Sequence, residues 1–410
     1  MDKLKCPEIR FGGFKGNWVS KNLEEEVKFF SGLTYSPFDI SNKSGTLVLR
    51  SSNVQDGEIS TLDNVYVRSD VVYCQNVEIG DIIVVVRNGS RNLIGKHATV
   101  KFDMNKTVIG AFMTGIRAKN HTFINALFDS NNFAAQVNKN LGATINQITN
   151  GAFKSMSFDF PQEEEQTAIG NFFQQLDQSI VLQQQKYTQT QNLKKAMLEK
   201  MFPKAGSKQP EIRIKGFGGD WEEQPLENIF GKIRNAFVGT STPYYVKSGN
   251  FYLESNNVKD GQINRKSEIF INDYFYSKQQ DKWLKTNDIV MVQSGHVGHS
   301  AVISEELNNS AAHALIIFSD YKVEANPHFI NYQLQTDNAK MAIEKITTGN
   351  TIKHILSSDM KRFVLLFTCP KEQTAIGQFF KQLDDTLALQ QQQLQTLKNL
   401  KHAFLAKMFV

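Results

Sequence analysis

A short run of basic and polar side chains, Arg87-Asn-Gly-Ser-Arg-Asn92, follows the apolar segment Ile82–Val86. Arginine can donate two hydrogen bonds to the edge of a guanine, and asparagine can pair with adenine in the same manner. Gly89 and Gly95 let the backbone approach a phosphate closely. We interpret the run as a candidate nucleic-acid contact, with a solvated hairpin loop as the alternative. The candidate residues are Arg87, Asn88, Ser90, Arg91, Asn92 and Lys96, with His97 beside them.

A matching polar turn, Gln293-Ser-Gly-His-Val-Gly-His-Ser300, follows an apolar segment in the second half of the chain. Its candidate contacts are Gln293, Ser294, His296 and His299. Two histidines could also indicate a metal, but no cysteine or carboxylate lies nearby at the spacing that a metal site requires. A hydrogen-bonding turn is the favoured interpretation.

Three further segments are candidate phosphate contacts. Residues 138–144 and 347–353 place small polar side chains around a glycine, which suits backbone N–H contact to phosphate or, equally, a helix C-cap and turn. Lys278 and Lys282 precede Trp283, which is either a base-stacking ring or a half-buried core residue. The candidates in these segments are Lys139, Thr144, Thr348, Asn350, Lys353, Lys278 and Lys282.

Catalytic motifs are weak by comparison. Asn326-Pro-His-Phe329 is similar to the motif with which adenine methyltransferases hold an exocyclic amine, but no glycine-rich cofactor turn precedes it. Asn326 before Pro327 is already explained as a helix N-cap and first turn. No phosphate-binding loop of the Gly-x-x-x-x-Gly-Lys-Ser/Thr type occurs, so the sequence does not indicate a nucleotide-driven motor.

The elements that carry these residues are duplicated. Residues 165–203 and 372–410 align without gaps at 23 identities in 39 positions, beginning with Glu-Gln-Thr-Ala-Ile-Gly and ending in Lys-Met-Phe plus one residue. Upstream, residues 7–18 and 210–221 share 8 of 12 positions, including Pro-Glu-Ile-Arg and a tryptophan. A weaker repeat, Leu-x-Ser-x-Asn-Val-x-Asp-Gly-x-Ile, begins at Leu49 and at Leu253. Each half is therefore a variable domain followed by a nearly duplicated segment.

Both duplicated segments are expected to be long helices. Apolar residues recur in steps of four and three from Ile169 and from Ile376, a heptad pattern typical of coiled coils. Gln183, Thr190 and Gln390 interrupt the seam with polar side chains that can fix its register. A span of ~39 residues at ~1.5 Å each gives a helix of ~58 Å. Antiparallel pairing within one chain is the favoured arrangement, and pairing between chains is the alternative.

The remaining sequence favours an α+β fold, with two globular domains related by pseudo-twofold symmetry. Strands are expected at Thr46–Arg50, Ile82–Val86, Thr99–Phe102, Phe251–Leu253, Ile269–Ile271, Ile289–Val292 and Ala314–Phe318. Helical patterns lie near Thr122–Val137 and Pro327–Ile346. The expected domains are residues 1–160, a helix at 161–203, residues 204–369 and a helix at 370–410.

Composition is consistent with DNA binding without requiring it. The formal charge is +5 and the pI about 8.8, while residues 19–160 hold 14 basic and 13 acidic side chains, so phosphate contact must come from local loops. Three scattered cysteines suit a reducing compartment. Neither a signal peptide nor a membrane-spanning run is visible, and we expect a cytoplasmic protein.

Taken together, these features resemble the specificity subunit of a type I restriction–modification system. The resemblance covers the whole chain and rests on the order variable domain, helix, variable domain, helix. Its motifs are the Pro-Glu-Ile-Arg…Trp openings, the helix beginnings Pro161-Gln-Glu-Glu-Glu-Gln166 and Pro370-Lys-Glu-Gln373, and the segment from Arg87 to Lys96. The first helix beginning has two extra residues between proline and Glu-Gln, so the two helices need not start at equivalent positions.

The resemblance implies that each variable domain reads one half of a bipartite, asymmetric target in double-stranded DNA. It implies that the helices set the spacing and dock two methylation subunits, which carry the S-adenosylmethionine chemistry, and that restriction subunits using ATP and Mg²⁺ join them. The chain itself would bind no cofactor or metal and make no bonds. A tether without DNA readout is the alternative. The helix residues expected at the coiled coil and at partner docking are Ile169, Phe173, Leu176, Ile180, Ile376, Phe380, Leu383 and Leu387.

Overall fold

The computed structural model describes residues 5–42, 44–141, 146–349 and 353–410. The chain forms two compact units. Unit 1 comprises residues 1–184 and 392–410, and unit 2 comprises residues 185–391. Each unit therefore contains parts of both long helices, and each is described by itself. The division between the units falls inside the two long helices.

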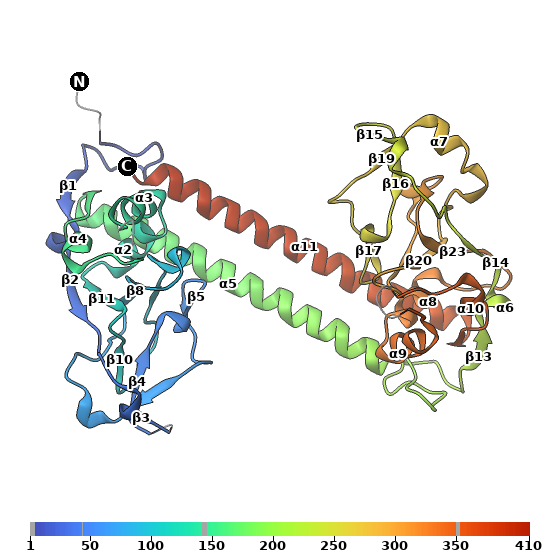
Figure 1. Ribbon diagram of the computed structural model, residues 1–410, viewed down its shortest axis with the longest axis horizontal. Coiled ribbons are helices and arrows are strands. Elements are labelled where there is room, and N and C mark those ends of the chain that lie inside the picture. The colour runs from blue at the N-terminus through green and yellow to red at the C-terminus, as the bar shows by residue number, and fades with distance from the viewer. Residues whose placement is uncertain (1–4, 43, 142–145, 350–352) are drawn as a thin grey trace. The chain divides into compact units, whose positions relative to one another are not determined.

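Unit 1 is built on two four-stranded sheets (Figure 1). The first has the order β2 (Val27–Ser31), β11 (Met113–Ala118), β8 (Ile82–Val85), β9 (His97–Thr99). The second has the order β10 (Thr107–Ile109), β4 (Thr46–Leu49), β7 (Val65–Val67), β3 (Ile40–Ser41). Two-stranded pairs are β1 (Val19–Asn22) with β12 (Ser157–Phe160), and β5 (Val54–Gln55) with β6 (Glu58–Ile59). All pairings are antiparallel except that of β10 with β4.

Unit 2 repeats this topology strand for strand. Its first sheet has the order β14 (Phe230–Asn235), β23 (Leu315–Tyr321), β20 (Ile289–Val292), β21 (Ser300–Val302). The second has the order β22 (Ala311–Ala312), β16 (Asn250–Leu253), β19 (Phe270–Ile271), β15 (Tyr245–Val246). The pairs are β13 (Glu222–Pro225) with β24 (Val364–Phe367), and β17 (Val258–Lys259) with β18 (Gln262–Ile263). The duplication expected from the sequence is therefore a duplication of fold.

One expected strand is displaced. Thr99–Phe102 was the expected span, but β9 covers His97–Thr99, because Ala98 pairs with Ile83 and His97 with Val84. The apolar and β-branched residues that suggested the later span follow the strand instead. The remaining expected strands lie within two or three residues of observed ones.

Each of the two expected helical segments contains two helices. They are α2 (His121–Phe128) and α3 (Asn131–Asn140) in unit 1, and α8 (Pro327–Leu334) and α9 (Asp337–Ile346) in unit 2. Ser130 accepts a hydrogen bond from the N–H of Phe133 and donates to the carbonyl of Leu127. Thr336 makes the same two contacts in unit 2. These hydroxyls end one helix and begin the next. Asn326 is the N-cap of α8, as expected.

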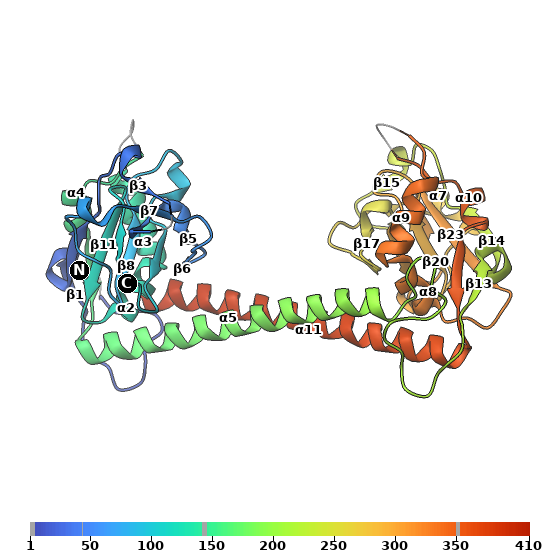
Figure 2. The ribbon, with the colours of Figure 1, turned by 90° about the horizontal axis from the view of Figure 1, so that it is seen from below.

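Helices α5 (Glu163–Lys200) and α11 (Pro370–Met408) begin at equivalent positions of the duplicated sequence. They lie side by side in antiparallel directions along one side of the sheets within each unit (Figure 2). In unit 1 the ring of Phe172 on α5 is 5.1 Å from that of Phe404 on α11. In unit 2 the ammonium of Lys194 on α5 is 2.6 Å from the carboxylate of Asp384 on α11. Every position of the expected heptad seam is buried or half-buried.

The shorter helices connect these elements. They are α1 (Leu23–Glu26), α4 (Asn150–Lys154), α6 (Leu226–Ile229), α7 (Asp273–Ser277) and α10 (Ser357–Lys361). Short 3₁₀ turns are η1 (Pro37–Asp39), η2 (Ser51–Asn53), η3 (Ser69–Val71), η4 (Arg91–Leu93), η5 (Thr242–Tyr244), η6 (Ser255–Asn257), η7 (Gln280–Lys282) and η8 (Glu305–Leu307). Among the residues that the structure describes, no helix is long and apolar enough to cross a bilayer.

The repeated Arg and Glu of the two sequence motifs form a buried ion pair in each unit. Arg10 holds Glu165 through two hydrogen bonds of 2.7 and 2.6 Å, and its remaining amine reaches the carbonyl of Gly16. Arg213 holds Glu372 through two hydrogen bonds of 2.8 Å. Both carboxylates are almost fully buried. The pair therefore fastens the segment before the first strand of each unit to the start of a long helix.

Candidate nucleic-acid interface

The candidate run of the first half forms a turn after the central strand β8, named turn 1 here (Arg87–Asn92). Its backbone is fixed on two sides. Arg87 donates its N–H to the carbonyl of Phe112 at 3.1 Å and forms a β-bridge with Gln147. Asn88 donates its N–H to the carbonyl of Asn146 at 3.2 Å. Turn 1 is thus held between the residue before β11 and the segment that follows α3.

Side chains bring a third segment to turn 1. The amide of Asn88 donates to the hydroxyl of Ser51 at 2.9 Å, and its oxygen accepts the N–H of Ser90. Asn146 donates from its amide to the carbonyl of Gly89 at 2.9 Å. The guanidinium of Arg87 lies over the ring of Phe112, 4.8 Å from its centre. Arg87, Ser90, Arg91, Asn92 and Lys96 are exposed and Asn88 is half-buried.

The matching turn of unit 2, named turn 2 here (Gln293–His299), follows β20 and is held in the same way. Ser294 forms a β-bridge with His354, and Gly295 donates its N–H to the carbonyl of Lys353 at 3.0 Å. A ring nitrogen of His296 lies 2.9 Å from the carbonyl of Ser255, which belongs to the same repeat motif as Ser51. In each unit, therefore, three segments meet on one face: the turn after the central strand, the segment that follows α3 or α9, and the 3₁₀ turn that contains Ser51 or Ser255.

Strand register shows which positions of the two turns correspond. Val85 pairs with Met113 and Val292 pairs with Leu315, so Val85 matches Val292. Gln293 therefore matches the buried Val86, and its side-chain oxygen is itself buried. Arg87 matches Ser294, as their bridges to Gln147 and His354 also indicate. At this matched position, unit 1 presents a guanidinium and unit 2 a hydroxyl.

The histidines of turn 2 lie close together and are held by hydrogen bonds. The rings of His296 and His299 are 5.4 Å apart. His299 accepts the backbone N–H of Asp260 at 3.2 Å through a ring nitrogen. Burial lowers the pKa of His299, so this side chain is uncharged at neutral pH. It is suited to hydrogen bonding rather than to attracting phosphate by charge.

Several of the other expected contacts lie near the two turns. Lys139 is exposed in the last turn of α3, which extends to Asn140, so residues 138–140 end a helix, in agreement with the helix C-cap alternative. Thr348 pairs through its backbone with His354, and Lys353 is 2.6 Å from the carboxylate of Glu344. Thr144 and Asn350 lie outside the described residues.

Lys278 and Lys282 belong to a different part of unit 2, around α7 and η7. The ammonium of Lys278 lies 4.3 Å from the ring centre of Tyr274. Trp283 is half-buried, stacks on Tyr276 at 4.3 Å and donates its indole N–H to the carbonyl of the same residue. The structure therefore favours the core interpretation of Trp283 over a free stacking platform.

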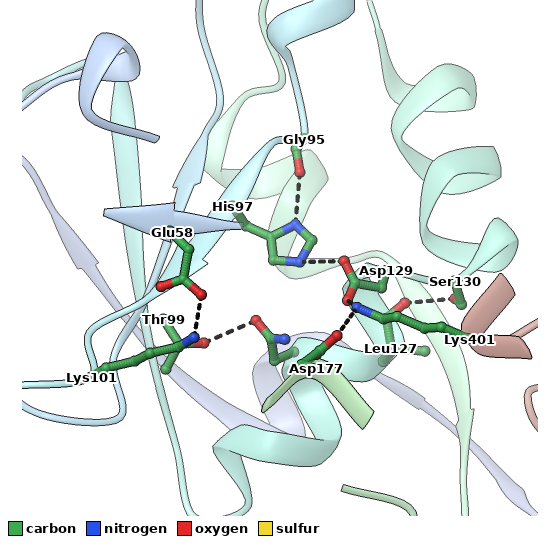
Figure 3. A network of polar contacts seen from close by, with 11 residues as sticks. Glu58, Gly95, His97, Thr99, Lys101, Leu127, Asp129, Ser130, Asp177 and Lys401 are labelled. Carbon is green, nitrogen blue, oxygen red and sulfur yellow. Dashed lines mark hydrogen bonds and ion pairs between the residues drawn. The ribbon is translucent and has the colours of Figure 1, made fainter. Parts of the chain in front are cut away.

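His97, which follows the candidate run in the sequence, is buried, and its ring packs against Phe128 and Phe133. It lies 3.3 Å from the carboxylate of Asp129, which is 2.7 Å from the ammonium of Lys401 (Figure 3). Lys401 also lies 2.6 Å from Asp177 on α5. This network lines a cleft of about 550 Å³ between α5, α11 and the sheets of unit 1. Its residues hold the helices to the domain, and the His97 ring has a structural role in this network.

The charges of this network are strongly coupled. Burial by itself would raise the pKa of Asp129, but the hydrogen bond with His97 and the charge of Lys401 lower it to about 2. Burial raises the pKa of Asp177, an effect that Lys401 only partly offsets. In unit 2 the same helix positions carry Lys194 and Asp384, and the hydroxyl of Tyr332 donates to Asp384 at 2.7 Å.

The expected helix residues separate into two groups. Ile169 and Phe173 lie in the hydrophobic core of unit 1, and Ile376 and Phe380 lie in that of unit 2. The other four, Leu176, Ile180, Leu383 and Leu387, are half-buried. The four buried residues therefore anchor the beginnings of the two helices in the domain cores, and the four half-buried residues lie further along the helices.

Sequence reasoning missed four residues that contact turn 1: Ser51, Phe112, Asn146 and Gln147. The repeat that contains Ser51 and Ser255 was recognised, but its pattern did not predict that these serines contact turn 1 and turn 2. Phe112 follows a glycine and an alanine and has no periodic pattern around it. Its position at turn 1 depends on strand register, which the sequence did not reveal.

Comparisons with known proteins agree with this architecture. Residues 15–192 and 219–399 match a sequence model of the family described as "Type I restriction modification DNA specificity domain". The chain therefore belongs to this family. The two matches fall on the two halves of the duplicated chain.

Similar proteins include the type I restriction enzyme EcoKI specificity subunit of Escherichia coli K12. It is 23% identical over 97% of this chain and 89% of its own length. The MjaVIII specificity subunit of Methanocaldococcus jannaschii is 20% identical over 63% of each chain. Among solved structures, the type I restriction–modification S subunit from M. genitalium matches with a TM-score of 0.65 at 14% identity, covering 99% of both chains.

Proposed function

We propose that this chain is the DNA-recognition subunit of a type I restriction–modification complex, in which each unit reads one half of a bipartite, asymmetric target in double-stranded DNA. One observation carries the proposal. Two units of the same topology hold their turns by the same backbone contacts but present different side chains, Arg87 in one and Ser294 in the other. A duplicated scaffold with divergent reading residues suits a target whose halves differ.

The long helices are proposed to set the spacing of the two readers and to dock two methylation subunits. Exposed apolar side chains on them support docking, with Leu182 57% and Leu389 55% exposed. Restriction subunits would join the same assembly. A structure reported under a title on type I complex assembly matches this chain with a TM-score of 0.52 over 95% of its length. In this proposal the chain makes no bonds, and S-adenosylmethionine, ATP and Mg²⁺ act on the partner subunits.

The alternative of a self-contained adenine methyltransferase has less support. Asn326, the residue that would hold the target amine, accepts the N–H of Phe329 as the cap of α8. Its backbone N–H is bound to Gln373 of α11. This asparagine therefore has a structural role that accounts for the motif.

A domain exchange tests the proposal. Residues 19–160 are replaced by the matching region of a relative, and the chain is expressed with its methylation subunits. Sequencing of methylated bases should show that only one half of the methylated motif changes. The reciprocal exchange of residues 222–369 should change only the other half. A change in both halves or in neither, or methylation without any bipartite motif, would contradict the proposal and favour a tether.

A further inference from the structure

Two arginines on turn 1 differ from the others of the first domain. Five arginines lie between residues 19 and 160. Three of them are bound to carboxylates: Arg50 to Asp63 at 2.7 Å, Arg117 to Asp81 at 2.8 Å, and Arg68 to Asp39 at 3.6 Å. Among the described residues, no acidic side chain pairs with Arg87 or Arg91. Unpaired guanidinium groups are what an anionic or acceptor-rich ligand requires.

Arg87 is held more firmly than Arg91. Its backbone is anchored on one side by Phe112 and on the other by Gln147, and it directly follows a buried central strand. Arg91 lies in the 3₁₀ turn η4, where its carbonyl accepts the N–H of Ile94. A reading side chain must be positioned to within a fraction of an ångström, whereas a phosphate contact tolerates looser placement.

Phe112 supports the guanidinium of Arg87. The ring is 51% exposed, which is unusual for a phenylalanine, and the guanidinium carbon lies 4.8 Å from its centre. Stacking on an aromatic face restrains the plane of the guanidinium while its N–H groups remain free at the edge. A planar fork of two donors matches the O6 and N7 acceptors of guanine in the major groove.

Unit 2 lacks both parts of this arrangement. Ser294 stands at the position of Arg87. Gly110 of unit 1 matches His313 of unit 2. Two residues, Ala111 and Phe112, separate Gly110 from β11, whereas a single residue, Ala314, separates His313 from β23. Phe112 is therefore an additional residue of unit 1, and it lies directly against the unpaired arginine.

We propose that Arg87, oriented by Phe112, reads a guanine in the half-target of unit 1, and that Arg91 contacts a phosphate beside it. This inference rests on the proposed function and assigns one base to one residue. Ser294 offers no such fork, so the half-target of unit 2 does not depend on a guanine at the corresponding place.

Conservative substitutions separate base reading from charge. The assembled methylation complex is prepared with the wild-type chain and with Arg87→Lys, Phe112→Leu and Arg91→Lys. Binding is measured to duplexes that carry each of the four base pairs at every guanine of the unit 1 half-target, which the domain exchange identifies. Arg87→Lys should reduce the preference for guanine at one position by about 10-fold to 100-fold, because lysine cannot form the planar fork.

The other variants serve as matched comparisons. Phe112→Leu should weaken the same preference to a smaller extent, because the arginine remains but its plane is no longer fixed. Arg91→Lys should retain the wild-type preference at every position, since lysine also contacts phosphate. Arg91→Ala should weaken binding to all duplexes alike and reduce the slope of log affinity against log salt by about 1.

The assignment fails if the unit 1 half-target contains no guanine, or if Arg87→Lys and Phe112→Leu weaken binding equally to all four base pairs. A uniform loss would show a role in affinity or folding rather than in reading. The proposed function is judged separately, by whether the wild-type complex methylates a bipartite motif at all. A bipartite motif that is unaffected by Arg87→Lys would overturn this inference and leave the proposed function intact.

Discussion

Single residues explain why the sequence repeats where it does. The repeated arginine and glutamate are two ends of one buried ion pair in each unit, although more than 150 residues separate them along the chain. The repeated tryptophan is fully buried in both units, where Trp18 packs on Phe123 and Trp221 on Phe329. A buried charge without its partner is strongly destabilising, so neither member of a pair can change without the other.

Asp129 provides a residue-level test through pH. Its pKa is lowered from 3.8 to about 2 in the folded chain. A lowered carboxyl pKa stabilises the folded state above the unfolded value, and this contribution is lost as pH falls from about 4 toward 2. Asp129→Asn should therefore destabilise unit 1 by on the order of 2 kcal/mol at pH 7, about half as much at pH 3, and only by a few tenths of a kcal/mol near pH 2.

Urea denaturation of both proteins across this pH range measures the difference. Asp63→Asn is the control, because Asp63 forms an exposed pair with Arg50. An exposed pair contributes less than about 1 kcal/mol. A stability difference between wild type and Asp129→Asn that stays constant from pH 7 to pH 3 would show that the network around Lys401 does not hold the carboxylate in its charged form.

At the scale of elements, close approach of two helices accounts for the repeated glycine of the Glu-Gln-Thr-Ala-Ile-Gly motif. A Cβ on Gly170 would lie 2.3 Å from the hydroxyl of Thr122 and 2.7 Å from the backbone nitrogen of Phe123. A Cβ on Gly377 would lie 2.6 Å from the side-chain oxygen of Asn326. In each unit a long helix therefore passes directly over the start of a shorter one.

Gly170→Ala should destabilise unit 1 by about 1–3 kcal/mol, because backbone atoms of α2 must move to admit the methyl group. Gly151→Ala is the matched control: Gly151 is also helical, and a Cβ there meets nothing within 4 Å. The control should be neutral or stabilising by up to about 1 kcal/mol. Thermal unfolding of the two variants distinguishes them, and equal melting temperatures would refute the close-contact explanation.

At the scale of the whole molecule, each globular core includes a phenylalanine that follows the C-terminal end of a long helix. Phe409, near the C-terminal end, packs on Trp18, Phe123 and Phe173 in unit 1. In unit 2 the equivalent Phe202 packs on Trp221, Phe329 and Phe380. The core of unit 1 therefore combines residues from near both ends of the chain, whereas unit 2 is formed by one continuous segment.

Phe409→Ala should destabilise unit 1 by about 3–5 kcal/mol and leave unit 2 unchanged, while Phe202→Ala should do the reverse. Hydrogen exchange followed peptide by peptide measures protection in each unit of the full chain. Protection should fall in β8 and β11 for the first variant and in β20 and β23 for the second. Equal loss of protection in both units for either variant would show that the units do not unfold separately.

The sequence predicted the secondary-structure elements more completely than the contacts between them. The duplication, the two long helices and their heptad seam followed from identity and periodicity, which are properties of the chain itself. The breaks at Ser130 and Thr336 were missed because a hydroxyl inside an apolar pattern reveals its capping role only when its hydrogen bonds are known. The position of β9 was missed because register depends on the partner strand.

The amino-acid sequence alone determined the family and the α+β class and indicated the two turns that we propose as DNA contacts, since these depend on residue types and their spacing. Only the tertiary structure decided which residues meet at those turns. The contacts of Arg87 with Phe112 and Gln147 join segments that are distant along the chain, and strand pairing brings them together. The same pairing matched Arg87 with Ser294, and no local pattern could have revealed that difference between the two units.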